Sequence, residues 1–310
     1  MVAGLLSSTT AISQQLSRRT QFVTNTYLVN PAVAGTKSFT PIMASFRNQW
    51  TGFEQAPTTY TLSAHTTLPN KIGIGGIFFR DDAGGAVSST GLELTGTYHV
   101  DLNNSDAVSF GLSGILGQYQ FDNTALIVRD LDDPSILDVK ESEIGFDANF
   151  GMMVYGNNYF FGLSIPQLLQ TSYNFDGFQA DNNERVRHYN FMGSYLYYFG
   201  SEFAIQPSAL VKFTATSPVQ FDFHIKGIYQ DFLWASVGYR LRDAVTMGLG
   251  TEYNNFLFSY SYDITVTEAS TFSPHTHELT VGYYILRKRA TFTQKSLLGP
   301  RVLGRRRLVR

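Results

Sequence analysis

Long stretches of this chain alternate apolar and polar residues with a period of two, which is typical of β-strands with two different faces. From Leu92 to Asp101 the apolar side chains fall mainly on even positions and the polar ones on odd positions. The same alternation recurs from Val219 to Lys226 and from Phe256 to Asp263. Because an amphipathic helix repeats every 3.6 residues, these stretches favour an all-β fold over a helical one.

Turn residues divide the chain into candidate strands. We count fourteen, at about 38–47, 57–67, 70–80, 88–101, 106–120, 143–155, 158–167, 185–199, 202–213, 218–228, 232–241, 244–252, 255–263 and 276–286. Many of them reach ten residues. That exceeds the ~5–6 residues of a typical soluble strand and approaches the ~9–11 needed to cross a bilayer at a tilt.

Composition indicates that these strands meet lipid. Charged residues are only 15% of the chain and aromatic residues also 15%, yet the mean hydropathy is −0.09. No apolar run reaches the ~18 residues of a membrane helix. In a transmembrane barrel, apolar lipid-facing and polar lumen-facing residues alternate and cancel in such an average. The expected inward positions are small or polar, as at Ser109, Gly111, Ser113, Thr246, Gly248 and Gly250.

The connections between the expected strands fall into two kinds. Those after even-numbered strands are tight and rich in Gly, Asn, Asp or Ser, as at Gly156-Asn157. Those after odd-numbered strands are mostly long, with 121–142, 168–184 and 264–275 the longest and 240–243 a short exception. Short periplasmic turns and long extracellular loops are typical of outer-membrane barrels. The sequence therefore predicts an antiparallel β-barrel of about 14 strands that spans the cell outer membrane.

Three regions are expected along the chain. Residues 1–20 form an N-terminal extension or a residual signal segment, and residues 21–286 form the barrel, whose lumen the N-terminal segment partly plugs. Residues 287–310 hold nine Lys or Arg, including Arg305, Arg306 and Arg307, and no acid. This basic tail would lie in the periplasm, where it docks an acidic partner, binds anionic lipid or cell-wall polymer, or is a solvated disordered end.

Signatures of catalysis and metal binding are weak. No Walker loop, Rossmann fingerprint, GxSxG elbow or HExxH motif occurs. His275, His277 and Glu278 could ligate a metal, but a polar strand edge is the favoured interpretation. Four aspartates (Asp130, Asp132, Asp133 and Asp138) lack the spacing of a calcium loop. A set of Asp222, His224 and Ser208 is not distinguished from other polar residues. We therefore expect no enzyme activity, cofactor or metal.

A family resemblance rests on other residues. The run Asn30-Pro31-Ala32-Val33-Ala34-Gly35, the preceding residues from 21, and the block Arg47-Asn48-Gln49-Trp50-Thr51-Gly52-Phe53 followed by Pro57 resemble the start of PorP/SprF proteins of the type IX secretion and gliding-motility system. Blocks at 162–169, 207–212, 260–263 and 277–279 resemble its later parts. The resemblance spans about residues 20–286 and departs at Val33, where the family usually has an aromatic residue.

The resemblance implies an outer-membrane component of the type IX machinery. It would bind periplasmic lipoproteins of the PorK/PorN type and support export or surface anchoring of a secreted protein or adhesin with a C-terminal sorting domain. Outer-membrane lipid is the other expected partner, and nucleic acid is not one. A passive porin-like channel for small solutes is the alternative, and a barrel hydrolase is a third.

The motif residues also have a physical interpretation. Asn30 and Pro31 precede the first strand, so they are expected at the periplasmic mouth, where Pro31 fixes an extended backbone and Gly35 permits a tight turn. The segment from Arg47 to Pro57 is expected to form the first extracellular connection. Within it, Trp50 and Phe53 are expected to fold inward as a cap over the lumen, with partner binding as the alternative. Together with Gln49, these residues are the partner-binding or capping candidates.

Overall fold

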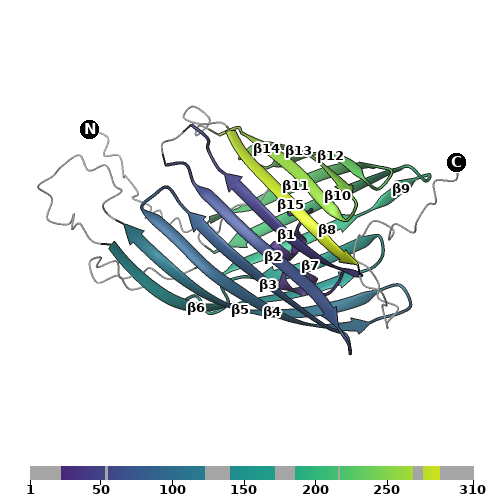
Figure 1. Ribbon diagram of the computed structural model, residues 1–310, viewed down its shortest axis with the longest axis horizontal. Coiled ribbons are helices and arrows are strands. Elements are labelled where there is room, and N and C mark those ends of the chain that lie inside the picture. The colour runs from purple at the N-terminus through teal and green to yellow at the C-terminus, as the bar shows by residue number, and fades with distance from the viewer. Residues whose placement is uncertain are drawn as a thin grey trace, which may run out of the picture.

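The computed structural model describes residues 22–52, 55–122, 140–171, 186–215, 217–267 and 275–286. Two short 3-10 helices come first and β-strands follow to the end of the described chain (Figure 1). The elements are η1 Thr26–Leu28, η2 Pro31–Val33, β1 Phe39–Asn48, β2 Thr58–Leu68, β3 Ile72–Asp82, β4 Val87–Asp101, β5 Ala107–Asp122, β6 Lys140–Tyr155, β7 Tyr159–Ile165, β8 His188–Tyr195, β9 Tyr197–Phe199, β10 Phe203–Thr214, β11 Ser217–Tyr229, β12 Leu233–Arg240, β13 Ala244–Tyr253, β14 Phe256–Thr265 and β15 His275–Leu286. Among the described residues, no helix is long and apolar enough to cross a membrane.

The strands close into one antiparallel barrel. Each pairs with its neighbours in the sequence, and β1 pairs with β15, which joins the first strand to the last. β8 and β9 are two parts of one barrel strand, since both pair with β10. Their break faces the part of β10 that contains Pro207, which has no backbone N–H to donate. Counted this way the barrel has 14 strands, which confirms the sequence prediction.

The two faces of the wall differ as the alternation predicts. Ser109, Ser113 and Thr246 point inward and are at most 1% exposed. Large apolar side chains such as Leu94 and Leu112 point outward and are exposed. This inside-out distribution is that of a barrel whose outer surface meets lipid and whose closure satisfies the backbone groups of the wall.

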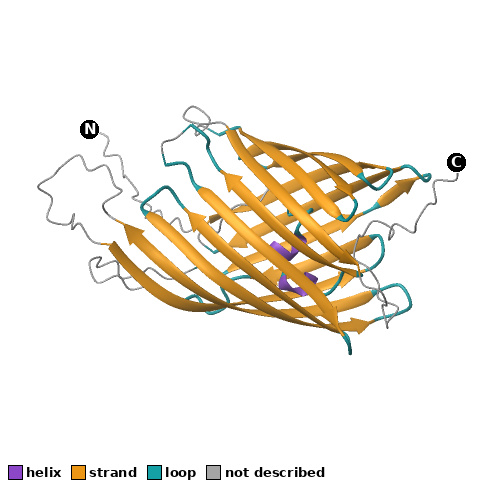
Figure 2. Ribbon diagram, in the orientation of Figure 1, coloured by secondary structure: helices purple, strands orange, loops and turns teal. Residues whose placement is uncertain are grey.

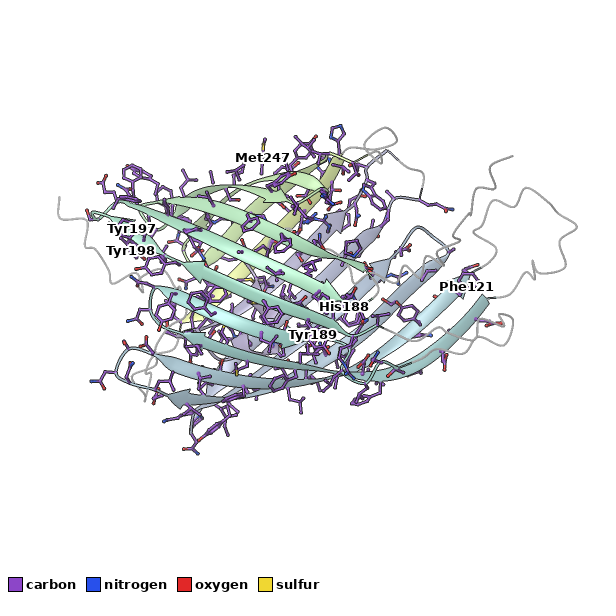
Figure 3. All side chains as sticks on the ribbon, turned by 180° about the vertical axis from the view of Figure 1, so that it is seen from behind. Phe121, His188, Tyr189, Tyr197, Tyr198 and Met247 are labelled. Atoms are coloured by element: carbon purple, nitrogen blue, oxygen red, sulfur yellow. The ribbon has the colours of Figure 1, made fainter. Side chains whose placement is uncertain are left out.

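The two ends of the barrel carry different connections. We call "turn end" the end that holds 69–71, 102–106, 156–158, 200–202, 230–232 and 254–255, all short. The "loop end" holds the connections 49–57, 83–86, 123–139, 166–187, 215–216, 241–243 and 266–274. Tyr197 and Phe121 mark opposite ends (Figure 3). The predicted asymmetry holds, although 83–86 and 215–216 join 241–243 as short connections at the loop end.

The hydrophobic core lies inside the barrel and is built around the N-terminal segment. Both 3-10 helices lie within the ring of strands (Figure 2). Phe22, Tyr27 and Val33 of this segment pack against Met153 and Phe160 of the wall, and all five are at most 2% exposed. Residues 22–36, called "the plug" below, therefore fill part of the lumen.

Candidate functional site

The plug contains the motif Asn30 to Gly35, and its backbone differs from the expectation in one respect. Asn30 is extended and caps η2, with its side-chain oxygen 2.9 Å from the backbone N of Ala32. Pro31 is the first residue of that 3-10 helix, so the predicted extended path through Pro31 is wrong. A proline at the first helical position costs no hydrogen bond, because the N–H there has no partner in the helix. Gly35 does form the expected tight turn, with φ of +78°.

Asn30 fastens the plug to the wall. Its side chain is fully buried, and Nδ2 donates to the carbonyl oxygens of Met152 at 3.3 Å and Leu163 at 3.2 Å. These two carbonyls belong to neighbouring strands, β6 and β7, at a directly paired register position. One side chain thus spans two strands and the plug at once. The motif lies inside the lumen near the turn end, deeper than the predicted position at the mouth.

Hydroxyl groups of the wall pair with the carbonyl groups of the plug. Ser164 donates to Val29 O at 2.7 Å, Ser109 to Ala32 O at 2.7 Å, Thr97 to Ala34 O at 2.8 Å and Thr67 to Gly35 O at 2.6 Å. Because a buried carbonyl without a donor costs free energy, these short polar side chains allow an irregular segment to be buried in the lumen. Small inward polar residues are therefore a binding surface for the plug.

Glycines of the wall bring its backbone close to the plug. A Cβ atom added at Gly151 would lie 2.1 Å from Asn30 Oδ1, and one at Gly111 would lie 2.6 Å from the backbone of Ala32. One at Gly73 would lie 2.4 Å from Ala34 O. Any side chain at these positions would push the plug away. The wall is thus shaped for this segment in this place.

A second layer of polar contacts holds the start of the plug. Asn25 Nδ2 donates to Ser63 Oγ at 2.8 Å, and the Tyr27 hydroxyl bonds Thr95 Oγ1 at 2.7 Å. The Tyr27 ring meets His65 edge-on, with centroids 5.0 Å apart. Burial raises the pKa of the Tyr27 hydroxyl well above its ordinary value, so the phenol stays neutral. The plug is therefore joined to the wall through neutral hydrogen bonds.

Above the plug, toward the loop end, the lumen holds a cavity of about 250 Å³. Residues 27–31 of the plug form its floor, and Glu93, Asn149, His188 and Lys212 are among its walls. A smaller cavity of about 60 Å³ lies on the turn-end side and is lined by Lys37, Lys226 and Glu252. The plug thus separates the two cavities.

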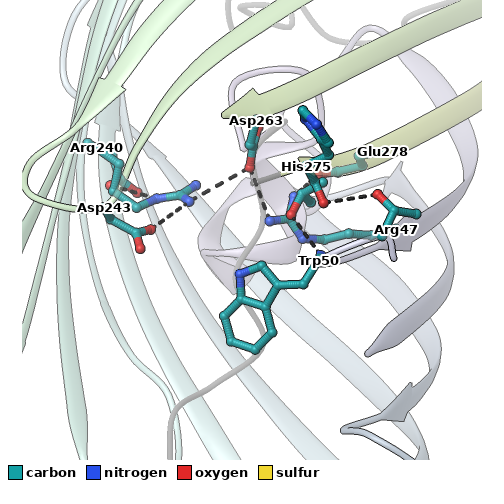
Figure 4. A network of polar contacts seen from close by, with 10 residues as sticks. Arg47, Trp50, Arg240, Asp243, Asp263, His275 and Glu278 are labelled. Carbon is teal, nitrogen blue, oxygen red and sulfur yellow. Dashed lines mark hydrogen bonds and ion pairs between the residues drawn. The ribbon is translucent and has the colours of Figure 1, made fainter. Parts of the chain in front are cut away.

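A network of ion pairs lies inside the loop end of the lumen (Figure 4). Arg47 bridges Asp263 at 3.1 Å and Glu278 at 3.0 Å. Arg240 bonds Asp222 at 3.2 Å and Asp243 at 3.0 Å, and it lies 3.8 Å from Asp263.

Arg47 lies in β1 and not in the connection where the sequence predicts it. Arg47 is not part of the first extracellular connection, because β1 extends to Asn48 and directs the Arg47 side chain into the lumen, where it is 6% exposed. Among the described residues the network joins two guanidinium groups to four carboxylates near the extracellular opening. Arg47, Asp222, Arg240, Asp263 and Glu278 occupy inward positions on β1, β11, β12, β14 and β15, and Asp243 lies in the connection after β12. A charged residue at an inward position is the sequence signal that could have revealed the network.

The other candidates of the first connection lie beside this network. The backbone N of Gln49 donates to Pro57 O at 2.8 Å, which closes the connection at its base. The backbone N of Trp50 donates to Thr276 Oγ1 of β15 at 3.2 Å. Trp50 is half-buried and has a φ of +58°. Phe53 lies outside the described residues, as do Arg305, Arg306 and Arg307, so the cap over the lumen stays a prediction.

The structure places the weaker chemical candidates in two separate regions of the wall. His275 and His277 face outward on β15, whereas Glu278 faces the lumen, so the three cannot share a metal. Ser208 lies directly opposite His224 in the register of β10 and β11, and Asp222 shares the inward face of His224. The Ser208 hydroxyl bonds Ser194 Oγ at 2.8 Å, and Asp222 bonds Arg240. Within the described part of the chain no group of three or more His, Asp or Glu is placed to hold a metal ion. The four aspartates of the 121–142 loop lie outside it.

Comparison with known proteins decides the family. The family model of the type IX secretion system membrane protein PorP/SprF matches residues 11–283. The chain belongs to the PorP/SprF family. This membership and the 14-stranded barrel place the protein in the outer membrane as a membrane component of type IX secretion. The plug motif and the Arg47 block lie inside the matched region.

Solved barrels share the architecture with this PorP/SprF protein. The TodX deltaS2S3 mutant monoaromatic hydrocarbon channel has 9% sequence identity and a TM-score of 0.50, covering 85% of this chain and 94% of that one. The Ralstonia pickettii toluene transporter TbuX has 10% sequence identity and a TM-score of 0.47, covering 84% of this chain and 92% of that one. The KdgM porin has 10% sequence identity and a TM-score of 0.40, covering 78% of this chain and 98% of that one. At such identities the likeness shows the fold alone. No curated protein sequence matches the chain.

Proposed function

We propose that this protein is a binding scaffold of the type IX machinery. In this role it holds periplasmic lipoproteins at its turn end and supports export or surface anchoring of a secreted protein at its loop end. It acts by binding and not by catalysis. The passive channel for small solutes is the second candidate, and the cavity above the plug is the observation in its favour.

The observation that carries the scaffold proposal is the plug. Val29, Ala32, Ala34 and Gly35 each give a carbonyl to a wall hydroxyl, and Asn30 ties two strands together. Displacement of a segment held by this many buried contacts costs free energy, because each broken hydrogen bond leaves a buried donor or acceptor without a partner. An obstructed lumen is more consistent with a scaffold that binds other proteins than with a channel that conducts solutes.

The two ends of the barrel would meet different partners. Loops 121–142 and 168–184 are the proposed contacts for the secreted protein, because loops on a rigid scaffold carry specificity. Trp50 and the surrounding first connection would lie beside them, above the ion-pair network of the lumen. The short turns and the basic tail of residues 287–310 would face the periplasmic lipoproteins. The positive charge of the tail, which includes Arg305, Arg306 and Arg307, suits an acidic partner.

Affinity purification from native membranes, followed by mass spectrometry, tests the proposal. We expect periplasmic lipoproteins and one secreted protein to co-purify with the barrel. A variant that lacks residues 287–310 should lose the lipoproteins and keep the secreted protein. Unchanged partners in that variant would remove the tail from the proposal, and absence of both partner classes would remove the scaffold role.

Planar-bilayer recordings distinguish the alternative. The scaffold proposal predicts low conductance for the intact barrel, because the plug obstructs the lumen. A porin predicts a steady ionic conductance with no protein partner. A stable open channel from the wild-type protein, together with no recovered partner, would favour the porin.

A further inference from the structure

The outer wall of the barrel changes character near the loop end of β14 and β15. Outward side chains closer to the turn end are apolar, as at Phe256, Phe258 and Val281. On the same face of β15, His277 and then His275 follow toward the loop end, and His275 is exposed. Polar side chains on a lipid-facing wall are unfavourable within the hydrocarbon region, so these histidines lie at its extracellular boundary.

The register of the neighbouring strands supports this boundary. Leu279 of β15 is level with Tyr260 of β14 and with Phe46 of β1. One step nearer the loop end, His277 is level with Tyr262 and Asn48. An apolar row thus gives way to a polar row on adjacent strands. Such a step marks the level at which lipid headgroups begin.

The two histidines are held in place by tyrosines. The Tyr260 hydroxyl bonds His277 Nδ1 at 2.6 Å, and the Tyr262 hydroxyl bonds His275 Nδ1. The Tyr262 ring also stacks on His275, with centroids 5.5 Å apart and planes 21° apart. A phenol that donates to Nδ1 fixes the proton of a neutral imidazole on Nε2. In the tautomer in which the tyrosine hydroxyls donate to Nδ1, each ring presents an Nε2–H donor on the outer wall.

We propose that His275 and His277 form a docking site for the phosphate group of an outer-leaflet lipid. Two N–H donors two residues apart on one strand face can both reach one phosphate, and such bonds to a charged acceptor are among the stronger hydrogen bonds in proteins. Glu278 cannot repel this lipid from the same face, because its side chain lies in the lumen.

Lipid retention by the purified, folded barrel tests this site. Detergent-solubilised protein is mixed with micelles that contain diphosphoryl lipid A, and retained lipid is counted by native mass spectrometry. The variant His275→Leu/His277→Leu should retain lipid A roughly tenfold less tightly, because two charge-assisted bonds are lost. The matched control is Gln118→Leu/Gln120→Leu, a change of two outward polar residues near the loop end of β5, which should bind as the wild type does.

Three further results decide the interpretation. His275→Lys/His277→Lys should restore retention, since lysine also presents N–H donors to a phosphate. Lipid A without phosphates should not distinguish the wild type from the leucine variant. Equal retention by the wild-type protein and the leucine variant would overturn the proposal. A second result would also overturn it: the wild type binds one equivalent of Zn²⁺, both the leucine and lysine variants lose this binding, and lipid retention is the same in all three. The histidines would then be a metal site. Folding of each variant is checked by its heat-dependent shift on a gel.

Discussion

Arg47 and Glu278 are separated by 231 positions in the sequence, yet Arg47 Nη1 donates to Glu278 Oε2 over 3.0 Å inside the lumen. The two residues are directly paired in register between β1 and β15. Their ion pair therefore lies on the seam where the first strand meets the last and the barrel closes. The ion pair therefore forms only when β15 has paired with β1.

Removal of Arg47 should strongly destabilise the barrel. Arg47→Ala leaves the buried carboxylates of Asp263 and Glu278 without this cation, a loss on the order of 3–5 kcal/mol for a buried pair broken from one side. Lys71→Ala is the control, because its pair with Asp101 is partly exposed and should contribute under about 1 kcal/mol. Urea unfolding in lipid vesicles measures both. Similar losses for the two variants would contradict the role assigned to the network.

Asn30→Ala should loosen the plug. The variant loses the hydrogen bonds to Met152 O, Leu163 O and Ala32 N, and we expect it to lower stability by about 2–3 kcal/mol. Asn157→Ala is the control, since Asn157 lies exposed in a turn. Limited proteolysis should cut within residues 22–36 of the Asn30 variant faster than in the wild type. Equal cleavage rates would show that the asparagine does not fasten the plug.

A methyl group on the wall should displace the plug directly. The new Cβ of Gly151→Ala would lie 2.1 Å from Asn30 Oδ1, whereas that of Gly96→Ala meets nothing within 4 Å. We expect the Gly151 variant to raise single-channel conductance in planar bilayers and the Gly96 variant to leave it unchanged. If both variants stayed at the wild-type conductance while both folded, the plug would not be what limits conduction.

Lys37, between η2 and β1, should titrate in an unusual range. Burial lowers its pKa to about 8, the charge of Lys226 acts in the same direction, and Glu252 opposes both. Its acetylation rate, followed by mass spectrometry, should therefore be half-maximal near pH 8, and Lys226→Met should move that midpoint upward. A midpoint near 10.5, the ordinary lysine value, would contradict the lowered pKa of Lys37.

The lowered pKa of Lys37 makes the free energy of unfolding depend on pH. Between about pH 8 and the unfolded value of 10.5, the unfolded chain binds a proton at Lys37 that the folded chain has lost. The contribution of Lys37 to stability therefore rises with pH across this window and is constant below it. Comparison of urea midpoints for wild type and Lys37→Met at pH 7 and pH 10 measures it, and an equal difference between the two proteins at both pH values would contradict it.

Local patterning was sufficient for the strands. Every predicted strand corresponds to an observed barrel strand, including 185–199, which the structure divides into β8 and β9 at Leu196. A period of two is set by neighbouring residues in an extended chain, so it can be read without knowledge of the fold. The ends were less certain: β6 begins at Lys140, not at 143, and Arg47 proved to be the penultimate residue of β1.

The candidate site could be predicted only in part. The motif Asn30 to Gly35 was singled out by its resemblance to a family, yet its partners Met152, Leu163 and Ser109 lie far along the chain. The partners of Arg47 were missed for the same reason, because a charged residue on a strand does not reveal which distant strand will face it.

The sequence by itself determined an antiparallel barrel with an apolar outer face and a polar inner one, because alternation and turn chemistry are local properties of the chain. Tertiary structure alone decided what fills the lumen and which charges meet there. The wall glycines and hydroxyls form a binding surface for the plug only when β2 to β7 lie side by side. Arg47 reaches Glu278 only when β15 pairs with β1. Closure brings together residues from opposite ends of the chain, and that geometry belongs to the whole cylinder and not to any one segment of it.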